Sequence, residues 1–335
     1  MPRNAFTALA LVALSALAAS CSGPAPRPAS SGQPAASSPS PDAGAPRPPA
    51  AAVAPLARPD LGFDLALGRG HACARKEDGG VWCWGLNTYG QLGDGTRFER
   101  ATAARVRGIT DAAAVATGNM FSCALHATGA VSCWGARAAA GPGASMALSP
   151  EPIAGLADVV AISAGTSHAC ALTAARRVRC WGDNREGQLG DGTKEARPAP
   201  VDVVGVDDAI AVAAGDEISC ALLGKGGVAC WGQTRPNRRA DGLSPSPLTP
   251  TRVVGADDAV AVSQGFLHTC ILRKSGAVAC WGWLGQSTAE ARSAPTDVAG
   301  IAGAVKIAAG SGARCALLGS GEVRCWGTSN TKGEL

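Results

Sequence analysis

Cys123-Ala-Leu-His-Ala-Thr-Gly-Ala-Val-Ser-Cys-Trp-Gly135 is one copy of a unit that the chain contains six times. Each copy has two cysteines ten positions apart, and the second cysteine is always followed by Trp-Gly. The six pairs are Cys73/Cys83, Cys123/Cys133, Cys170/Cys180, Cys220/Cys230, Cys270/Cys280 and Cys315/Cys325. The copies recur every ~45 to 50 residues, and a period of this size is typical of propellers and solenoids.

The spacing inside the unit predicts a β-hairpin. If the two cysteines face each other, Leu125 pairs with Val131, and Ala127-Thr128-Gly129 remains as a three-residue loop whose last residue usually has positive φ. Glycine occupies that position in every copy except the third, which has Arg176. The cysteines then form a non-hydrogen-bonded pair, whose Cα atoms approach to ~4.5 Å, within disulfide reach. We therefore predict six disulfides, one inside each hairpin.

Two other interpretations of the cysteines remain open. They could be reduced, buried thiols that pack as small apolar side chains. They could bind zinc, although structural zinc sites favour ligands two to four residues apart. The count favours disulfides, because setting Cys21 aside leaves twelve cysteines that pair without remainder. Disulfides in turn indicate an oxidising compartment.

Two further strands are expected in each copy. An apolar segment ending in glycine precedes each hairpin, as in Val159-Val-Ala-Ile-Ser-Ala-Gly165. In five copies another glycine lies ten residues earlier, two positions after a β-branched residue, and marks a further strand. Four strands per repeat is the content of one propeller blade. We predict an all-β fold: a β-propeller of six blades with about four antiparallel strands each, with seven blades as the alternative.

The sixth copy has too few residues after Trp326 for a fourth strand. We expect the N-terminal segment 53–57 to supply this strand and so close the ring. A closed ring exposes no strand edge on which aggregation could begin.

The N-terminus has the layout of an export signal. Met1-Pro-Arg-Asn precedes an apolar run that is too short to span a bilayer and ends in small residues before Cys21. Leu17-Ala-Ala-Ser-Cys21 resembles the bacterial lipoprotein cleavage site, in which the cysteine is lipidated, and ordinary signal cleavage near Ala18 is the alternative. We predict a signal peptide over residues 1–20, a lipidated Cys21 with a disordered Pro/Ala/Ser tether over 21–52, and the propeller over 53–335.

These features predict an exported protein that is lipid-anchored at the cell envelope. The outer membrane is preferred, because Ser22 is not the aspartate associated with inner-membrane retention in some bacteria. A soluble secreted or periplasmic protein is the alternative. The net charge of +4 is small and scattered, so no nucleic-acid footprint is present. We expect a monomer that contacts the membrane only through its lipid.

The unit continues past Trp-Gly into a second motif. Asn87-x-x-Gly-Gln-Leu-Gly-Asp-Gly-Thr96 recurs at residues 184–193, and a fragment reappears at 330–335. The whole unit resembles the repeat of the regulator of chromosome condensation family over residues 53–335. The resemblance implies a β-propeller, usually of seven blades, and the cysteine pairs resemble those of exported bacterial relatives. The family namesake exchanges guanine nucleotide on the GTPase Ran and binds chromatin, and one secreted relative inhibits β-lactamases. No residue here can be matched to the exchange site.

The chemistry-bearing residues allow more than one interpretation. His71, His168 and His268 occupy the same slot in alternate copies, so they could mark a metal on the axis, but local hydrogen bonding fits the family pattern better. Asp94 and Asp191, each in Asp-Gly-Thr, could bind a metal or phosphate, although Asp and Gly are ordinary turn residues. The sequence has no Gly-x-Ser-x-Gly elbow and no P-loop. We predict no catalysis, no cofactor and no metal.

The copies differ most between Trp-Gly and the fourth strand. Variable loops on a rigid scaffold are a usual arrangement for recognition, and Arg, Trp and Phe are favoured at interface hot spots. The predicted partner-binding residues are Phe98, Arg100, Arg238, Arg239 and Trp283. We predict a non-catalytic scaffold that binds an unidentified protein or surface polymer. The alternatives are an exported enzyme or enzyme inhibitor and, less favoured, guanine-nucleotide exchange.

Overall fold

The computed structural model describes residues 64–136, 146–232, 247–266, 268–284, 291–310 and 312–327. The predicted signal peptide, Cys21, the tether and the closing segment 53–57 lie outside these residues. The described part is all-β: six antiparallel sheets, five of four strands and one of three. It contains no helix with the length and apolar character that crossing a membrane requires.

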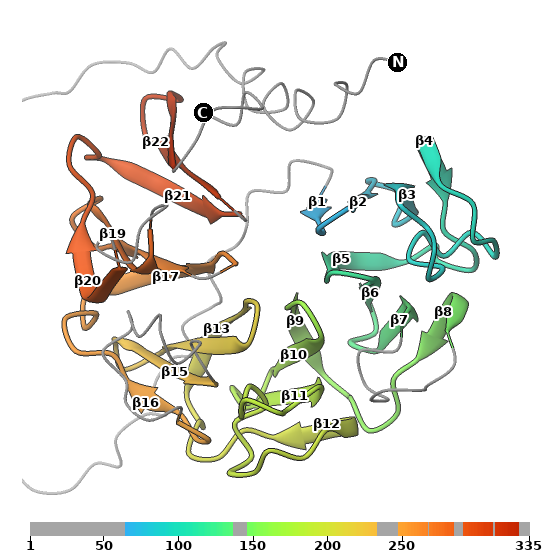
Figure 1. Cartoon of the computed structure of the whole chain (residues 1–335), viewed down its shortest axis with the longest axis horizontal. Coiled ribbons are helices and arrows are strands. Elements are labelled where there is room, and N and C mark those ends of the chain that lie inside the picture. The colour runs from blue at the N-terminus through green and yellow to red at the C-terminus, as the bar shows by residue number, and fades with distance from the viewer. Residues whose placement is uncertain are drawn as a thin grey trace, which may run out of the picture.

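Each sheet is built from strands consecutive in sequence, so each is one blade of a propeller. The strands of blades 1 to 3 are β1 Asp64–Leu67, β2 His71–Arg75, β3 Val81–Gly85, β4 Arg100–Arg105, β5 Ala112–Thr117, β6 Phe121–His126, β7 Val131–Gly135, β8 Ala147–Pro152, β9 Val159–Ala164, β10 His168–Thr173, β11 Val178–Gly182 and β12 Arg197–Asp202. The strands of blades 4 to 6 are β13 Ala209–Ala214, β14 Ile218–Leu223, β15 Val228–Gly232, β16 Thr251–Arg252, β17 Ala259–Gln264, β18 His268–Arg273, β19 Val278–Trp283, β20 Ala291–Asp297, β21 Ala304–Ala309, β22 Ala313–Leu318 and β23 Val323–Gly327. Figure 1 shows the six blades following one another around a common centre.

The hairpin register is the one that the cysteine spacing predicts. In blade 2, Cys123 pairs with Cys133 and Leu125 with Val131, and the His126 N–H donates to the Ala130 carbonyl at 2.8 Å. The last loop residue has positive φ in every hairpin, including Arg176 with φ 62°.

All six predicted disulfides are present, with Cα–Cα distances of 4.0 to 4.1 Å. They are Cys73–Cys83, Cys123–Cys133, Cys170–Cys180, Cys220–Cys230, Cys270–Cys280 and Cys315–Cys325. The prediction of one disulfide inside each hairpin is confirmed, and the alternatives of reduced thiols and of zinc ligands are wrong for these twelve cysteines.

Glycines at the end of each first strand bring neighbouring blades together near the axis. A Cβ on Gly68 would lie 2.5 Å from the Gly118 carbonyl oxygen, and a Cβ on Gly118 would lie 2.6 Å from that of Gly165. The same relationship continues from Gly165 to the Gly215 carbonyl, and from Gly265 to that of Gly310 at 2.6 Å. Any larger residue would push adjacent blades apart, because such distances are far inside van der Waals contact.

The core lies between blades. Five clusters of buried apolar side chains join consecutive blades, from blades 1 and 2 to blades 5 and 6. The tryptophan of the second blade belongs to the cluster in four of them, Trp134, Trp181, Trp231 and Trp281, and the partly buried Trp326 packs against the fifth. The prediction of six blades is therefore confirmed, whereas closure of the ring by segment 53–57 stays a prediction.

Candidate binding surface

The third strands of blades 1 to 5, from which the connections to the fourth strands start, all end at one end of the propeller, here called the loop face. The hairpins lie at the opposite end, the hairpin face, because successive strands are antiparallel. Two of these connections are described in full, residues 86–99 of blade 1 and residues 183–196 of blade 3. We call them the blade 1 loop and the blade 3 loop.

A buried asparagine fixes the backbone of the blade 1 loop. The Asn87 side-chain oxygen accepts a hydrogen bond of 3.0 Å from the Leu92 N–H. Its Nδ2 donates to the main-chain carbonyls of Thr96 and Phe98, each at 3.1 Å. Asn87 therefore ties the two ends of the loop together, and each of these backbone groups is held from inside the protein.

Asp94 completes this frame. Its carboxylate accepts bonds from the Thr96 N–H (2.9 Å) and hydroxyl (2.7 Å), and it pairs with Arg100 at 2.9 Å. Burial raises the pKa of Asp94, but the bonds from Thr96 and Arg100 outweigh burial and hold the pKa below its ordinary value. Asp94 is thus an ionised turn residue whose oxygens are engaged within the loop, as its Asp-Gly-Thr context predicts.

The blade 3 loop repeats this arrangement with the equivalent residues. The Asn184 side-chain oxygen accepts from the Leu189 N–H at 2.9 Å, and Asp191 accepts from the Thr193 N–H (2.9 Å) and pairs with Arg197 (2.9 Å). Two loops of different tip sequence, Arg97-Phe98-Glu99 and Lys194-Glu195-Ala196, are therefore held by equivalent bonds from an asparagine and an aspartate. The bond from Asn87 to the Phe98 carbonyl is particular to the blade 1 loop among the described residues.

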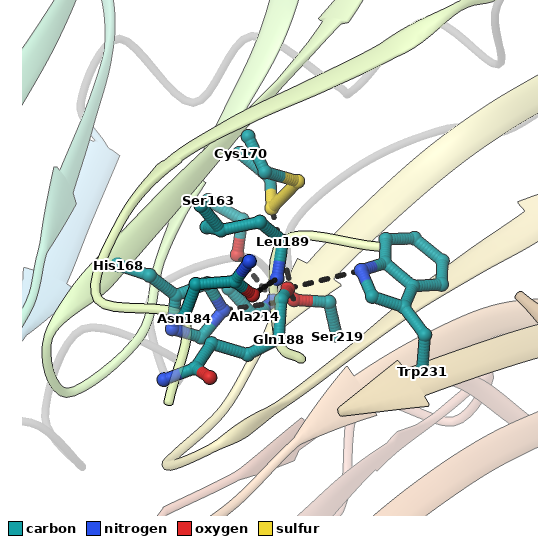
Figure 2. Close-up of a disulfide and its surroundings, with 10 residues drawn as sticks. Ser163, His168, Cys170, Asn184, Gln188, Leu189, Ala214, Ser219 and Trp231 are labelled. Carbon is teal, nitrogen blue, oxygen red and sulfur yellow. Dashed lines mark hydrogen bonds between the residues drawn. A yellow bond between two sulfur atoms is a disulfide. The ribbon is translucent and has the colours of Figure 1, made fainter. Parts of the chain in front are cut away.

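Each of these loops also bonds to the next blade. The main-chain carbonyl of Gln91 accepts from the Trp134 indole N–H and from the Ser122 hydroxyl, both at 2.9 Å. The Gln188 carbonyl accepts in the same way from Trp231 at 3.0 Å and from Ser219 at 2.9 Å, as Figure 2 shows. The loops thus hydrogen-bond blade 1 to blade 2 and blade 3 to blade 4. We call each of these two sets of hydrogen bonds a lock.

A buried histidine hydrogen-bonds to the serine of each lock. His71 Nε2 lies 2.8 Å from the Ser122 hydroxyl, and His168 Nε2 lies 2.8 Å from that of Ser219. Because each serine donates its proton to the carbonyl, Nε2 is the histidine donor and Nδ1 carries no proton. Burial lowers the pKa of His71 and His168 to about 4. Both are neutral at neutral pH and act in hydrogen bonding, which is the local role that the sequence favoured.

The third histidine has a different neighbour. Burial, reinforced by the charge of Arg314, lowers the pKa of His268 to about 3. Arg314 occupies the position that Ser122 holds between blades 1 and 2 and that Ser219 holds between blades 3 and 4. Its guanidinium donates to the Leu284 carbonyl at 3.1 Å. Among the described residues, no group of three or more His, Cys, Asp or Glu side chains is placed to hold a metal ion.

The predicted partner-binding residues are only partly placed. Phe98 is 75% exposed on the loop face. Arg100 lies beside it, with its guanidinium paired to Asp94. Trp283 ends β19, but its side chain, like Arg238 and Arg239, lies outside the described atoms. Their role in binding stays a prediction.

Ser122 and Ser219, the hydroxyls of the two locks, were not predicted from the sequence. A signal for them exists there. Each serine occurs in the copy that directly follows a copy with both a histidine in the common slot and a Gly-Gln-Leu-Gly motif.

The fold and these repeated locks define a disulfide-linked, six-bladed β-propeller of the repeat type. Two family models, both described as regulator of chromosome condensation (RCC1) repeat, match the chain, one at residues 64–91, 159–188, 259–285 and 304–334 and the other at 78–125 and 177–222. The chain belongs to this repeat family, which confirms the resemblance seen in its sequence.

Solved structures with the same fold include human WBSCR16, with a TM-score of 0.70 and 21% identity over 79% of this chain and 76% of that one. Yeast RCC1 (Prp20), solved with Kap60 bound, has a TM-score of 0.68 and 22% identity over 81% of this chain and 70% of that one. A structure of Saccharomyces cerevisiae Prp20p, described with its binding properties to Gsp1p and histones, gives 0.67 and 21%, over 80% and 72%. Identities this low show the fold alone. No curated protein sequence matches the chain.

Proposed function

We propose that this protein is a non-catalytic scaffold at the bacterial cell envelope that binds a protein or surface polymer through its loop face. The observation that carries the proposal is that the blade 1 and blade 3 loops share one internal hydrogen-bond frame but display different tips. A frame that is constant while its exposed residues vary is suited to recognition, because the backbone is ordered before a partner arrives.

Phe98 is the clearest candidate contact. Its carbonyl is held by Asn87 at 3.1 Å, whereas its side chain is 75% exposed. An exposed aromatic ring on a fixed backbone offers a large apolar contact at low entropic cost. Blade 3 has Glu195 at the equivalent position, so the same frame presents an anionic group there.

The proposed location rests on different residues. Six disulfides require an oxidising compartment, and the N-terminal sequence up to Cys21 has the layout of a lipoprotein signal. Metabolic labelling with an alkyne fatty acid tests the anchor. We expect label on the wild-type protein and none on Cys21→Ser, and an unlabelled wild-type protein would contradict lipidation.

Binding is tested by cross-linking capture from envelope extract with a matched pair of variants. Phe98→Ala removes the ring, 75% exposed, on the loop face, and Val254→Ala removes an apolar side chain that is 87% exposed on the hairpin face. We expect Phe98→Ala to reduce capture of the main cross-linked partner at least about fivefold, the effect of roughly 1 kcal/mol. Val254→Ala should leave capture unchanged.

Both variants should unfold at the wild-type temperature, because neither side chain belongs to a buried cluster. Capture that survives Phe98→Ala but is lost in Val254→Ala would place binding on the hairpin face and contradict the proposal.

A further inference from the structure

The short turns between the first and second strands of the blades surround the axis on the loop face, and we call them the axial turns. Each of the first strands β1, β5, β9, β13, β17 and β21 contacts the next, and Figure 1 shows them around the centre. Every axial turn begins with glycine: Gly68, Gly118, Gly165, Gly215, Gly265 and Gly310. The residue that follows differs in all six copies: Arg69, Asn119, Thr166, Asp216, Phe266 and Ser311.

The glycines and the residues after them meet different requirements. The glycines are constant because neighbouring blades pack on them near the axis. Of the residues that follow, all but Ser311 are among those that the structure describes, and none of these belongs to a buried apolar cluster. Packing of the core therefore does not determine their identity, and variation on a rigid frame is suited to recognition.

Asp216, in the axial turn of blade 4, is a buried carboxylate without a partner. The residue is 6% exposed, and its Oδ2 is buried with no hydrogen-bond partner within the described part of the chain. Burying an unpaired polar atom costs free energy, and aspartate is almost never buried unless it is paired. Folded proteins depart from such rules mainly at functional sites, where a ligand supplies the partner.

The next axial turn presents an aromatic ring beside this carboxylate. The turns of blades 4 and 5 are in contact, because a Cβ on Gly215 would lie 3.0 Å from the Gly265 carbonyl oxygen. Asp216 and Phe266 directly follow these two glycines. The guanidinium of Arg69, in blade 1, lies over the Phe266 ring, 5.6 Å from its centre. The ring of Phe266 therefore already attracts one cation to its face.

The cations of the protein itself leave Asp216 without a counter-ion. Arg69 contacts the Phe266 ring, and Arg185, in the blade 3 loop, pairs with Asp183 at 2.8 Å. Glu217 follows Asp216 in the same turn and adds a second acidic group. The axial turn of blade 4 thus carries two acidic side chains and no basic one, so it is complementary to a cation.

The chemistry of the turn favours an organic cation over a metal ion. Ca²⁺ and Mg²⁺ take about six or more oxygen ligands, and the described residues contain no group of three His, Cys, Asp or Glu side chains placed to hold a metal. An ammonium group needs only one carboxylate as its counter-ion. The lysine side chain carries that ammonium on a flexible apolar stem, which packs well on an aromatic surface.

We propose that the axial turns of blades 4 and 5 bind a lysine side chain of the protein partner. The ammonium pairs with Asp216, and the apolar stem lies against Phe266. This inference rests on the proposed function for the class of partner, a protein bound at the loop face, and adds the side chain that the partner presents. It does not involve Phe98, which belongs to the blade 1 loop.

The probe is the blocked peptide acetyl-Gly-Gly-Lys-Gly-Gly-amide. It is titrated into the full-length, oxidised protein at pH 7 and low salt while the backbone amide signals of Asp216, Glu217 and Phe266 are followed by NMR. We expect saturable shifts with Kd below about 5 mM. The same peptide with norleucine in place of lysine keeps the stem without the charge, and it should not bind.

Matched variants locate the site. Asp216→Asn keeps the shape of the side chain but removes its charge, and it should abolish the saturable shifts. Glu195→Gln removes an exposed carboxylate from the blade 3 loop and should bind like wild type. Arg69→Gln removes the cation over the ring and should tighten binding about two- to fivefold, whereas Arg97→Gln, in the blade 1 loop, should not.

Thermal unfolding without peptide separates a binding role of Asp216 from a structural one. An amide costs less to bury than an unpaired carboxylate, so Asp216→Asn should unfold at the wild-type temperature or above it while losing the peptide. A lower unfolding temperature together with unchanged peptide binding would show that Asp216 serves the fold and would overturn the proposal.

Two further outcomes overturn it. One is equal binding of the lysine and norleucine peptides, and the other is the absence of a shift at about 10 mM lysine peptide. If n-butylamine binds as tightly as the peptide, the site takes small amines and the assignment to a protein side chain is wrong. Phe98→Ala should bind the peptide like wild type, so failure of the Phe98 capture experiment and failure of this one are distinguishable.

Discussion

The indole N–H of Trp134, in blade 2, donates a 2.9 Å hydrogen bond to the main-chain carbonyl of Gln91, which belongs to blade 1. The Ser122 hydroxyl donates to the same oxygen at 2.9 Å, so both of its acceptor positions are used. Adjacent blades are therefore joined by specific polar contacts as well as by apolar packing. Because the acceptor is main chain, the bond depends on the path of the loop rather than on the side chain at position 91.

We expect Trp134→Phe to be more destabilising than Trp181→Phe. Both changes leave a similar gap in an interface, since both tryptophans are 1% exposed, but of the two only the Trp134 indole has an acceptor among the described residues. The difference should be about 1 kcal/mol, the net value of one buried hydrogen bond. Guanidinium unfolding of the two oxidised variants measures it. Equal losses of stability would show that the bond to Gln91 contributes little.

The parts of the fold that could be predicted from sequence are those specified by short-range spacing. Cys123 and Cys133 with Gly129 between them fix a hairpin and its register, because the turn type and the disulfide each allow only one alignment. Because the hairpin unit occurs six times in the sequence, six blades are then predicted. Ring closure could not be tested in this way, because segment 53–57 has no cysteine or glycine pattern that fixes its partner.

The locks between blades were less accessible from the sequence. The acceptors are the main-chain carbonyls of Gln91 and Gln188. Because every residue type has a main-chain carbonyl, the sequence does not show which one accepts. The Asp-Gly-Thr segment was correctly assigned to a turn, since Asp and Gly are turn residues, but nothing in its composition shows that Asp94 and Arg100 pair. When a hydrogen bond joins a side chain to the main chain, only the side chain, such as that of Ser122, can be recognised from the sequence.

The glycine contacts near the axis predict different costs for the same substitution. A Cβ at Gly165 would collide with the Gly215 carbonyl, whereas at Gly310, the equivalent position in blade 6, the nearest atom is the Ala313 oxygen at 3.5 Å. We expect Gly165→Ala to cost about 3 kcal/mol or more, or to prevent folding, and Gly310→Ala to cost less than about 1 kcal/mol.

Thermal unfolding and soluble yield, measured side by side, test this pair. If Gly310→Ala proved as damaging as Gly165→Ala, blade 6 would have to meet a further neighbour at that point, and ring closure would then be supported.

The disulfides should differ in their resistance to reduction. Four pairs have both sulfurs buried, whereas Cys315 and Cys325 are both partly exposed and Cys133 is partly exposed in its pair. The buried pairs are Cys73–Cys83, Cys170–Cys180, Cys220–Cys230 and Cys270–Cys280. Thiolate attack requires access, so Cys315–Cys325 should be reduced first under native conditions, followed by Cys123–Cys133.

Differential alkylation and peptide mass spectrometry at increasing dithiothreitol give the order of reduction. Reduction of a buried pair such as Cys270–Cys280 before Cys315–Cys325 would indicate that blades open locally rather than in order of exposure.

Because His71 and His168 are buried, we expect the free energy of unfolding to begin to fall near pH 6.5, at a higher pH than that at which carboxylates titrate. The pKa of His71 and of His168 falls from 6.5 to about 4 on folding, because burial penalises the charged ring. The second N–H of that ring, on Nδ1, would also have no hydrogen-bond partner among the described residues. Between these values the unfolded chain binds more protons, so stability is complete above about pH 6.5 and declines as the pH falls towards 4, by up to about 3 kcal/mol for each histidine. His168→Gln keeps a donor for Ser219 but does not titrate. Its free energy of unfolding, measured in guanidinium at pH 7 and pH 4.5, should fall by less than that of the wild type, and equal declines would mean that His168 is not protonated on unfolding in this range.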